Sequence, residues 1–354
     1  MCPSVRARTR CRVVAAQRLQ EAWLERLAFG LLAAQASEVQ RWSGIFPVSW
    51  RQLPHAALLR QQLASIEAHL SGSFTDLLTA MVLDPALQIS LNGPANHRGN
   101  PNENLARELL ELFSLGEGHY GEADVKEAAR ALTGYRLDRE GRLLLDPRRH
   151  DPGPKTILGR TDRFDGASLA AWLRRQPATA RHILGRVWRQ RIGPLPAPAR
   201  LEALAAEWRR QDLSLPWLRS TLGQIPEGAA SRGRRLDDPI TVVARSLALL
   251  GSPHPDALRI ARVQLAAMGQ PLLEPPSVKG WPVDAEWINL RWLQARRRGL
   301  LVLLGDEEVW SGRTLGPELP ATLTPLPPLT LSLLAEASRE MVALLFADPV
   351  WQLA

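Results

Sequence analysis

The chain has 354 residues, 45% of them apolar and 23% charged, and a formal net charge of +8. This composition is typical of a soluble globular protein and excludes a disordered chain. The longest uninterrupted apolar stretch runs from Met341 to Ala347. It is far shorter than the roughly 18 apolar residues that a membrane span needs, so the sequence predicts no membrane span.

The positive charge argues only weakly for a nucleic-acid partner. Of the 44 cationic residues only three are lysines, and the arginines are scattered among acidic residues instead of forming one basic stripe. No zinc-finger or RRM-like signature accompanies them. The sequence therefore favours a solvated basic surface over nucleic-acid binding.

Helical periodicity dominates the chain from its N-terminus. Ala15 to Gln40 predicts one or two amphipathic helices, and Pro54 to Leu83 a long helical stretch that a Ser-Gly-Ser sequence at residues 71–73 could interrupt. A loop rich in Gly, Pro and Asn follows, from Asn92 to Pro101.

Two clear helices come next. Glu103 to Leu115 places its leucines and Phe113 on one face, with Asn102 as N-cap and Gly116 just past the C-terminus. A second helix spans Glu122 to Thr133, and Leu137 to Leu158 predicts a hairpin or irregular excursion.

The remaining pattern is again helical. The predicted helices are Ala167 to Arg191, Ala197 to Arg210, Pro216 to Leu222, Pro239 to Leu250, Pro255 to Met268, a Trp-rich helix from Ala285 to Leu304, and Leu329 to Phe346. We expect an all-α fold, a multi-helix globular domain with long Pro/Gly/Asn-rich loops and little or no sheet. The expected divisions are an N-terminal helical segment (1–40), a main helical domain (41–313), and a proline-rich linker with a C-terminal helix packing back on the domain (314–354).

Rare residue types mark candidate functional positions. Five of the six asparagines fall between Asn92 and Asn104, and two of the three lysines, Lys155 and Lys279, lie in loops bounded by Gly or Pro. Turns and helix caps use asparagine for its backbone geometry, so a structural role is the alternative.

The helix that begins at Glu103 carries a polar stripe. Glu103, Arg107 and Glu111 follow i, i+4, i+8 spacing and project at about 0°, 40° and 80°, with Glu108 on the other flank. An arginine between two glutamates keeps both ionised, which suits metal ligation or substrate positioning. The alternative is a surface ladder of ion pairs that contributes little to stability.

The second candidate is the loop around His150. His150 with Asp151 could bind a divalent metal or act as a base, and Lys155 could stabilise a developing anion. A structural turn is the alternative. No HExxH, P-loop, dinucleotide or G-x-S-x-G motif is present, so the common catalytic classes gain no support.

Tryptophans gather near the proline-rich loop from Gln270 to Pro282. Trp281, Trp287 and Trp292 could form a platform for a carbohydrate or peptide, although packing in the core is the more frequent role of such residues.

Several motifs together resemble the bacterial DUF1800 family (domain of unknown function). They are Asn-Glu-Asn-Leu-Ala-Arg-Glu-Leu-Leu at residues 102–110, Asp-Val-Lys-Glu-Ala-Ala-Arg-Ala-Leu-Thr-Gly at 124–134, His150-Asp151 with Lys155, Val-Lys-Gly-Trp-Pro at 278–282, and the ending Asp-Pro-Val-Trp-Gln-Leu at 348–353. The resemblance spans roughly residue 40 to the end and implies a fold but no established activity.

The chain also departs from this resemblance. Ile45 stands where relatives commonly show His, Ser90-Leu91-Asn92 where they tend to show Tyr-Leu-Asp, and Asp237-Asp238-Pro239-Ile240-Thr241 replaces a Lys-Ser-Pro-x-Glu pattern. Relative to the family, residues 1–40 are a shortened N-terminal portion.

The same comparison bears on localisation. No secretory signal is recognisable in the first 19 residues, so the sequence as written predicts a cytoplasmic protein. Because family members often carry an export signal, a truncated N-terminus would change this to a periplasmic or exported protein.

Two hypotheses follow for function. The first is a hydrolase-like or metal-dependent enzyme of an envelope-associated lineage, with the cofactor unknown, a divalent metal conceivable, and the metal ligands left open. Its catalytic residues would be Glu103, Arg107, Glu108, His150, Asp151 and Lys155, and its substrate-binding residues Asn102, Asn104, Lys279 and Trp281. The alternative is a non-catalytic binding or scaffold partner of a sulfatase-like family protein, because the resemblance implies that such a protein is often encoded nearby.

Overall fold

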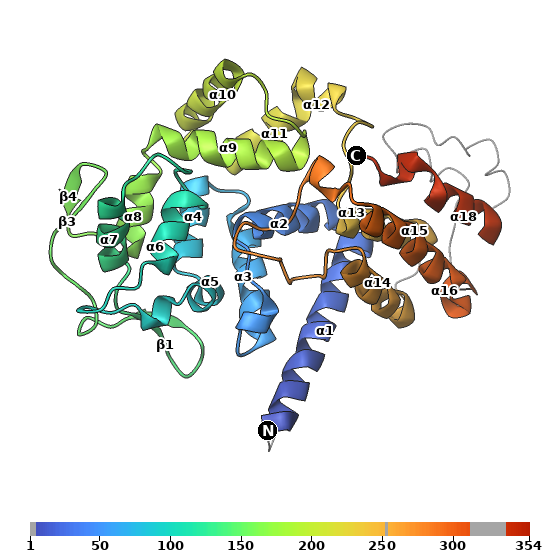
Figure 1. The fold of residues 1–354 in the computed structure, drawn as a ribbon, viewed down its shortest axis with the longest axis horizontal. Coiled ribbons are helices and arrows are strands. Elements are labelled where there is room, and N and C mark those ends of the chain that lie inside the picture. The colour runs from blue at the N-terminus through green and yellow to red at the C-terminus, as the bar shows by residue number, and fades with distance from the viewer. Residues whose placement is uncertain (1–4, 252–253, 312–337) are drawn as a thin grey trace.

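A long N-terminal helix forms the spine of the computed structural model, which describes residues 5–251, 254–311 and 338–354 (Figure 1). This helix, α1 (Val5–Phe29), packs against α2 (Ala33–Ile45) and α3 (Ala56–His69) and against two helices from far along the chain, α13 (Pro239–Leu250) and α14 (Pro255–Ala267). The N-terminal segment therefore helps to join the two ends of the described chain.

The first group of helices surrounds the polar motifs. Its members are η1 (Trp50–Gln52), α4 (Phe74–Val82), α5 (Pro85–Ser90), η2 (Gly93–Ala95), α6 (Asn104–Glu111), α7 (Glu122–Ala131) and α8 (Gly166–Leu173). The predicted interruption between α3 and α4 is confirmed. Ser73 and Asp76 form a reciprocal capping box there, which satisfies N–H groups at the start of α4.

Two short antiparallel hairpins occupy the stretch between α7 and α8. In one, β1 (Tyr135–Leu137) pairs with β2 (Leu143–Leu145), and in the other β3 (Lys155–Ile157) pairs with β4 (Arg160–Asp162). They agree with the predicted excursion. Because they are the only strands in the described part of the chain, the prediction of a mostly helical fold is confirmed.

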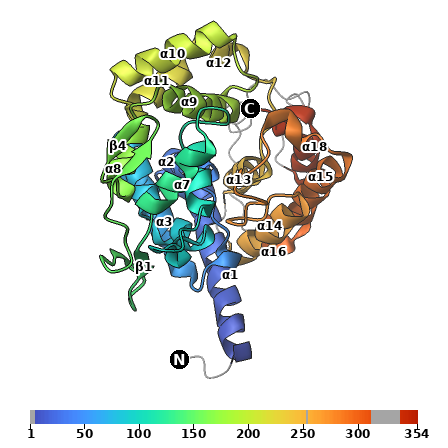
Figure 2. The same cartoon turned by 60° about the vertical axis from the view of Figure 1, so that its left-hand side comes forward.

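A second group of helices forms one side of the molecule, at the top in Figure 1 and again in Figure 2. It consists of α9 (Pro177–Arg191), α10 (Pro198–Arg210), α11 (Leu215–Gln224) and α12 (Pro226–Ala230). The predictions for α10 and α11 are confirmed, and α12 was not predicted. The single helix expected from Ala167 to Arg191 is wrong, because the structure divides it into α8 and α9, with Pro177 at the start of α9.

The C-terminal group contains α13, α14, η3 (Asp284–Trp287), α15 (Leu290–Gly305), α16 (Glu307–Ser311), α18 (Arg339–Ala347) and η5 (Pro349–Gln352). The predicted bounds of α13 are confirmed. Asp238 caps its N-terminus by accepting from the Thr241 amide, Pro239 opens it, and Gly251 ends it with a φ of 69°. The predicted linker 314–328 and the start of the predicted last helix lie outside the described residues.

Two further helix predictions need correction. The helix expected to reach Leu115 ends at Glu111, because the Leu115 and Gly116 amides both donate to the Leu110 carbonyl and Gly116 turns left-handed with a φ of 85°. The Trp-rich helix is divided, because the Asn289 side chain accepts from the amides of Arg291 and Trp292 and starts a new helix.

Buried apolar side chains from α1 to α18 form one contiguous core. Trp188, Trp208, Trp287 and Trp351 are fully buried within the molecule. Trp287, one of the three tryptophans of the predicted platform, is fully buried, which fits the packing role given above as the more frequent one. No described helix is long and apolar enough to cross a membrane. The three proposed divisions of the chain stay predictions.

Candidate functional site

The polar stripe on α6 is an ion-pair ladder on the surface. Arg107 donates to Glu103 at 3.1 Å and to both carboxylate oxygens of Glu122 at 2.8 and 2.9 Å. The hydrogen bonds that Arg107 donates to Glu122 and then to Glu103 raise the pKa of Arg107 above its usual value. All three side chains are at least 37% exposed, so the pairs link α6 to α7 but contribute little to stability.

Glu108 lies on the other flank and differs from its neighbours. Its carboxylate is half-buried, and no described residue donates a hydrogen bond or forms an ion pair with it. Burial, and then the negative charge of Glu111, raise the pKa of Glu108, while Lys279 opposes the shift. Glu111 is itself occupied, because it accepts from the Tyr120 hydroxyl at 3.0 Å.

A partly buried guanidinium holds the loop that carries Lys279. Arg186, on α9, donates to the Leu112 carbonyl at 2.9 Å and to the Lys279 carbonyl at 3.1 Å. It also reaches the carbonyls of Gly44 and Ile45 at the end of α2, at 3.4 and 3.2 Å. Burial lowers the pKa of Arg186 to about 10, and its four carbonyl acceptors offset part of that cost.

The Lys279 loop also makes a close backbone approach to α2. Gly280 has a φ of 90°, and a Cβ atom there would lie 2.3 Å from the Gly44 carbonyl oxygen. Only glycine fits this position. Arg186 and Gly280 together fix the direction of Lys279 and Trp281.

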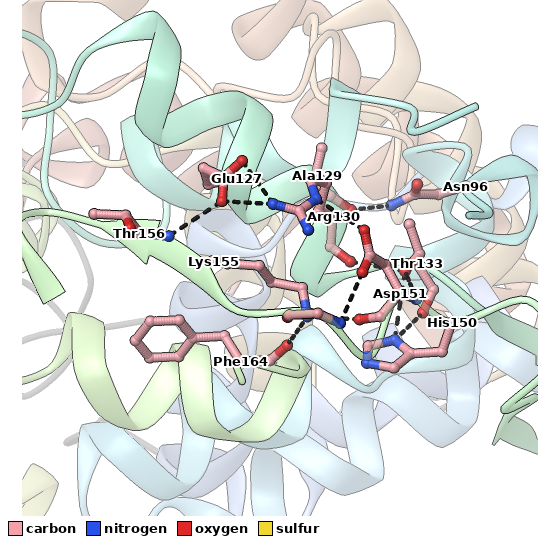
Figure 3. Close-up of polar contacts among 11 residues, drawn as sticks. Asn96, Glu127, Ala129, Arg130, Thr133, His150, Asp151, Lys155, Thr156 and Phe164 are labelled. Carbon is pink, nitrogen blue, oxygen red and sulfur yellow. Dashed lines mark hydrogen bonds and ion pairs between the residues drawn. The ribbon is translucent and has the colours of Figure 1, made fainter. Parts of the chain in front are cut away.

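Lys155 is fully buried and uses all its hydrogen bonds locally (Figure 3). Its ammonium donates to the carbonyls of Asp151, Gly153 and Phe164 at 2.6, 3.1 and 2.8 Å. Burial lowers the pKa of Lys155, and the charge of Asp151 opposes this shift. Three acceptors match the three donors of an ammonium group, so the contacts saturate it.

Asp151 and Glu127 hold Arg130 between them. The Arg130 guanidinium donates to Asp151 at 2.8 Å and to both oxygens of Glu127 at 2.9 and 2.8 Å. The hydrogen bond from Arg130 lowers the pKa of Asp151 below its usual range. Glu127 also accepts from the Thr156 amide at 3.1 Å, which fastens β3 to α7.

His150 packs against the end of α7. Its Nδ1 lies 2.9 Å from the Thr133 carbonyl, which can only accept, so Nδ1 is the donor in this hydrogen bond. Gly134 makes this packing possible, because a Cβ there would lie 2.7 Å from the His150 amide nitrogen. We call Glu127, Arg130, Thr133, His150, Asp151 and Lys155 the α7 brace.

The asparagine-rich loop is built from backbone contacts. Asn96 is buried, donates to the Ala129 carbonyl at 2.9 Å and accepts from the Asn102 amide at 3.0 Å. Asn102 accepts from the Asn104 amide at 3.0 Å and so orders the start of α6. Asn92 adopts a left-handed backbone with a φ of 60°. These contacts match the structural alternative for the asparagines.

A cavity of about 400 Å³ lies on the other side of the Lys279 loop, between α2, α13 and the segment 281–287. Among the side chains that line it are Arg41, Arg235, Asp237, Arg245, Trp281 and Trp287. Trp281 is the single predicted site residue in this wall. Glu108 and Lys279 lie outside the lining.

Asp237 is the centre of the charged wall. It pairs with Arg235 and Arg245 at 3.3 Å each, and Arg296 donates to its carbonyl at 2.6 Å. Burial raises the pKa of Asp237, and the two paired arginines act in the opposite direction. Sequence reasoning noted Asp237 only as a departure from the family and missed the arginines, because charges scattered along the chain give no signal of their tertiary pairing.

The predicted site residues therefore fall into separate places. His150, Asp151 and Lys155 come together in the α7 brace, Glu103 and Arg107 join Glu122, and Glu108 lies within electrostatic range of Lys279. Among the described residues, no hydrogen bond or ion pair connects the α6 stripe with the brace. The catalytic and substrate-binding assignments stay predictions.

One further group has ligand chemistry. His254, Asp256 and Glu308 have ligand atoms within 4.8 Å of one another. Asp256 is also paired with Arg259 at 2.8 Å, and all three side chains are partly or fully exposed. Sequence reasoning missed this group, and none of the predicted site residues belongs to it.

The fold and site define a mostly helical protein with a polar brace on α7 and, elsewhere, a cavity beside Trp281. The chain belongs to the family described as Protein of unknown function (DUF1800), whose model matches residues 6–353. No curated protein and no solved structure matches it.

Replacing Lys155 with methionine tests the structural role of the brace. We expect Lys155→Met to lower the free energy of unfolding by about 2–4 kcal/mol, because three buried carbonyls lose their donor. Chemical denaturation with urea measures the change. Lys126→Met, at an exposed position on α7, is the control and should change the free energy of unfolding by less than about 0.5 kcal/mol. Equal stability of the two variants would contradict a structural role for Lys155.

Proposed function

We propose that this protein is a non-catalytic binding protein that holds a small molecule in the cavity beside Trp281. The observation that carries the proposal is the cavity itself. At about 400 Å³ it falls in the size range of ligand sites, and three separate parts of the chain contribute to its wall.

The mixed lining supports binding. Leu27, Ile240 and Trp281 give the wall apolar surface, while Gln40 and Gln190 add polar groups. Ligand sites typically combine a mostly apolar wall with a few polar groups that orient the ligand.

The use of the predicted catalytic groups also supports binding over chemistry. The Lys155 ammonium already donates all its hydrogen bonds. The Asp151 carboxylate already accepts from Arg130 and, at 2.9 Å, from the Gly153 amide. A general acid or base must instead reach a reacting atom.

Filling the cavity tests the proposal. A neutral, environment-sensitive dye, Nile red, should bind the wild type saturably with one molecule per chain. Ser37→Trp places an indole in the lining, and we expect dye affinity to fall by about tenfold or more, which fluorescence titration measures. Ser65→Trp, on α3 and outside the lining, is the control and should bind as the wild type does. Unchanged binding by Ser37→Trp, or no saturable binding at all, would refute the cavity as a binding site.

A protein partner is part of this proposal. The four most exposed large apolar side chains among the described residues are Leu31, Leu32, Ile288 and Leu290, at 105%, 58%, 66% and 73%. Each lies within three residues of a cavity-lining residue, and exposed apolar groups favour partner surfaces. The resemblance suggests a sulfatase-like protein as this partner. Failure of the two proteins to co-purify after co-expression would count against it.

A hydrolase-like enzyme is the second candidate, and Glu108 is the observation that favours it. A half-buried carboxyl with a raised pKa within electrostatic range of a lysine suits proton transfer. A metal-dependent version additionally requires a bound divalent ion. Elemental analysis of protein purified without chelator tests this, and the absence of a divalent metal would contradict a metal-dependent enzyme.

Titration of Glu108 tests the second candidate without a known substrate. We expect its carboxyl to titrate above the ordinary value of 4.5, because burial and Glu111 disfavour the charged form. Lys279→Met should raise this pKa further, and Glu111→Gln should lower it. Carbon-13 NMR of labelled glutamate follows the titration, with Glu108→Gln to assign the signal. A titration midpoint at or below 4.5 that stays the same in both variants would rule out Glu108 as a general acid with a raised pKa.

A further inference from the structure

Donor groups without an acceptor gather at one side of the cavity. Eight buried side-chain nitrogen or oxygen atoms have no hydrogen-bond partner among the described residues. Four of them are donors in this wall or directly behind it, namely Arg245 Nε, Trp287 Nε1, Arg296 Nε and Arg296 Nη2. Buried polar groups are normally paired, so this concentration needs an explanation.

Arginines outnumber the carboxylates that pair with them at this side of the cavity. Arg235 and Arg245 both pair with Asp237, and their other acceptors are neutral backbone carbonyls. Among the described residues, Arg296 donates to the Asp237 carbonyl and, at 3.5 Å, to the Gln352 side chain. Asp238 is occupied by the Thr241 amide and hydroxyl at 3.1 and 2.8 Å.

A count of formal charges gives the sign of the imbalance. Arg41, Arg235 and Arg245 line the cavity together with Asp237, Asp238 and Asp284. Arg296 stands directly behind Trp287, with its guanidinium 5.5 Å from the indole centroid. Four arginines against three aspartates leave one positive charge. Glu38 pairs with both Arg41 and Arg191. Including Glu38 and Arg191 in the count adds one charge of each sign and leaves the excess unchanged.

Burial makes this excess costly. Desolvation lowers the pKa of Arg296 to about 10, and it also lowers the pKa of Arg245. A buried cation without a full counter-charge is unfavourable, and an anion brought into the same low-dielectric region would offset the cost.

We propose that the ligand of this cavity is a monoanionic carboxylate with an aromatic or similarly flat apolar body. The single excess positive charge fits one carboxylate better than a dianionic phosphate. Trp281, Ile240 and the small side chains of Ala244 and Ala248 provide the apolar surface for the body. This inference rests on the proposed binding function and adds the chemical class of the ligand.

Two probes of equal shape test the requirement for charge. Isothermal titration calorimetry should give 2-naphthoate an affinity at least about tenfold higher than that of the neutral 2-naphthalenemethanol, because only the acid supplies the counter-charge. The preference should shrink as salt rises, since part of the wall is open to solvent.

Matched arginine variants locate the effect. Arg41→Ala removes a lining cation that is 36% exposed and paired with Glu38, so the fold should tolerate it, and it should weaken naphthoate binding by about fivefold or more. Arg174→Ala removes a similarly exposed arginine that pairs with Asp212 away from the cavity, and it should bind naphthoate as the wild type does.

The outcomes separate this inference from the proposed function. Equal binding of acid and alcohol would overturn the requirement for an anion and leave the cavity a binding site. Binding of neither probe would overturn the ligand class, and the Nile red result would then decide whether the cavity binds anything. If Arg41→Ala and Arg174→Ala weakened naphthoate binding equally, the result would overturn the assignment of the carboxylate to this cavity.

Discussion

The partly buried guanidinium of Arg186 joins three parts of the chain that are far apart in sequence. Its bonds to the carbonyls of Gly44, Ile45, Leu112 and Lys279 connect the ends of α2 and α6 to the loop before η3. Each of these bonds satisfies a carbonyl outside regular helix pairing, and together they tie the three segments to α9. The loop consequently carries Lys279 within electrostatic range of Glu108 and presents Trp281 to the cavity.

Most of the fold could be predicted because its signals are local. The bounds of α13 follow from Asp238 and Pro239 before the apolar run and from Gly251 after it. The end of α6 could not be predicted from periodicity alone. Apolar residues continue to Phe113 and Leu115, but they are buried from a turn whose shape depends on Gly116 and on the neighbouring His182 ring, 2.6 Å from a Cβ placed at Gly116.

The candidate site was less predictable because its chemistry depends on tertiary partners. Rarity correctly singled out Lys155 as a special position, but rarity does not distinguish an ammonium saturated by three carbonyls from one that meets a substrate. The i, i+4 spacing on α6 likewise could not reveal Glu122 as the second partner of Arg107. The pairing of Arg235 and Arg245 with Asp237 joins positions up to eight residues apart across a helix start, and no sequence motif marks it.

The central claim is that ligand binding belongs to the cavity at Trp281 and that the brace around Lys155 serves the fold. Crystals grown with 4-bromobenzoate, measured at the bromine absorption edge, test this claim most directly. The account predicts an anomalous peak inside the cavity, beside Trp281 and within reach of the Asp237 arginine cluster. A peak between Glu108 and Lys279 or against His150, with the cavity empty of bromine, would contradict it.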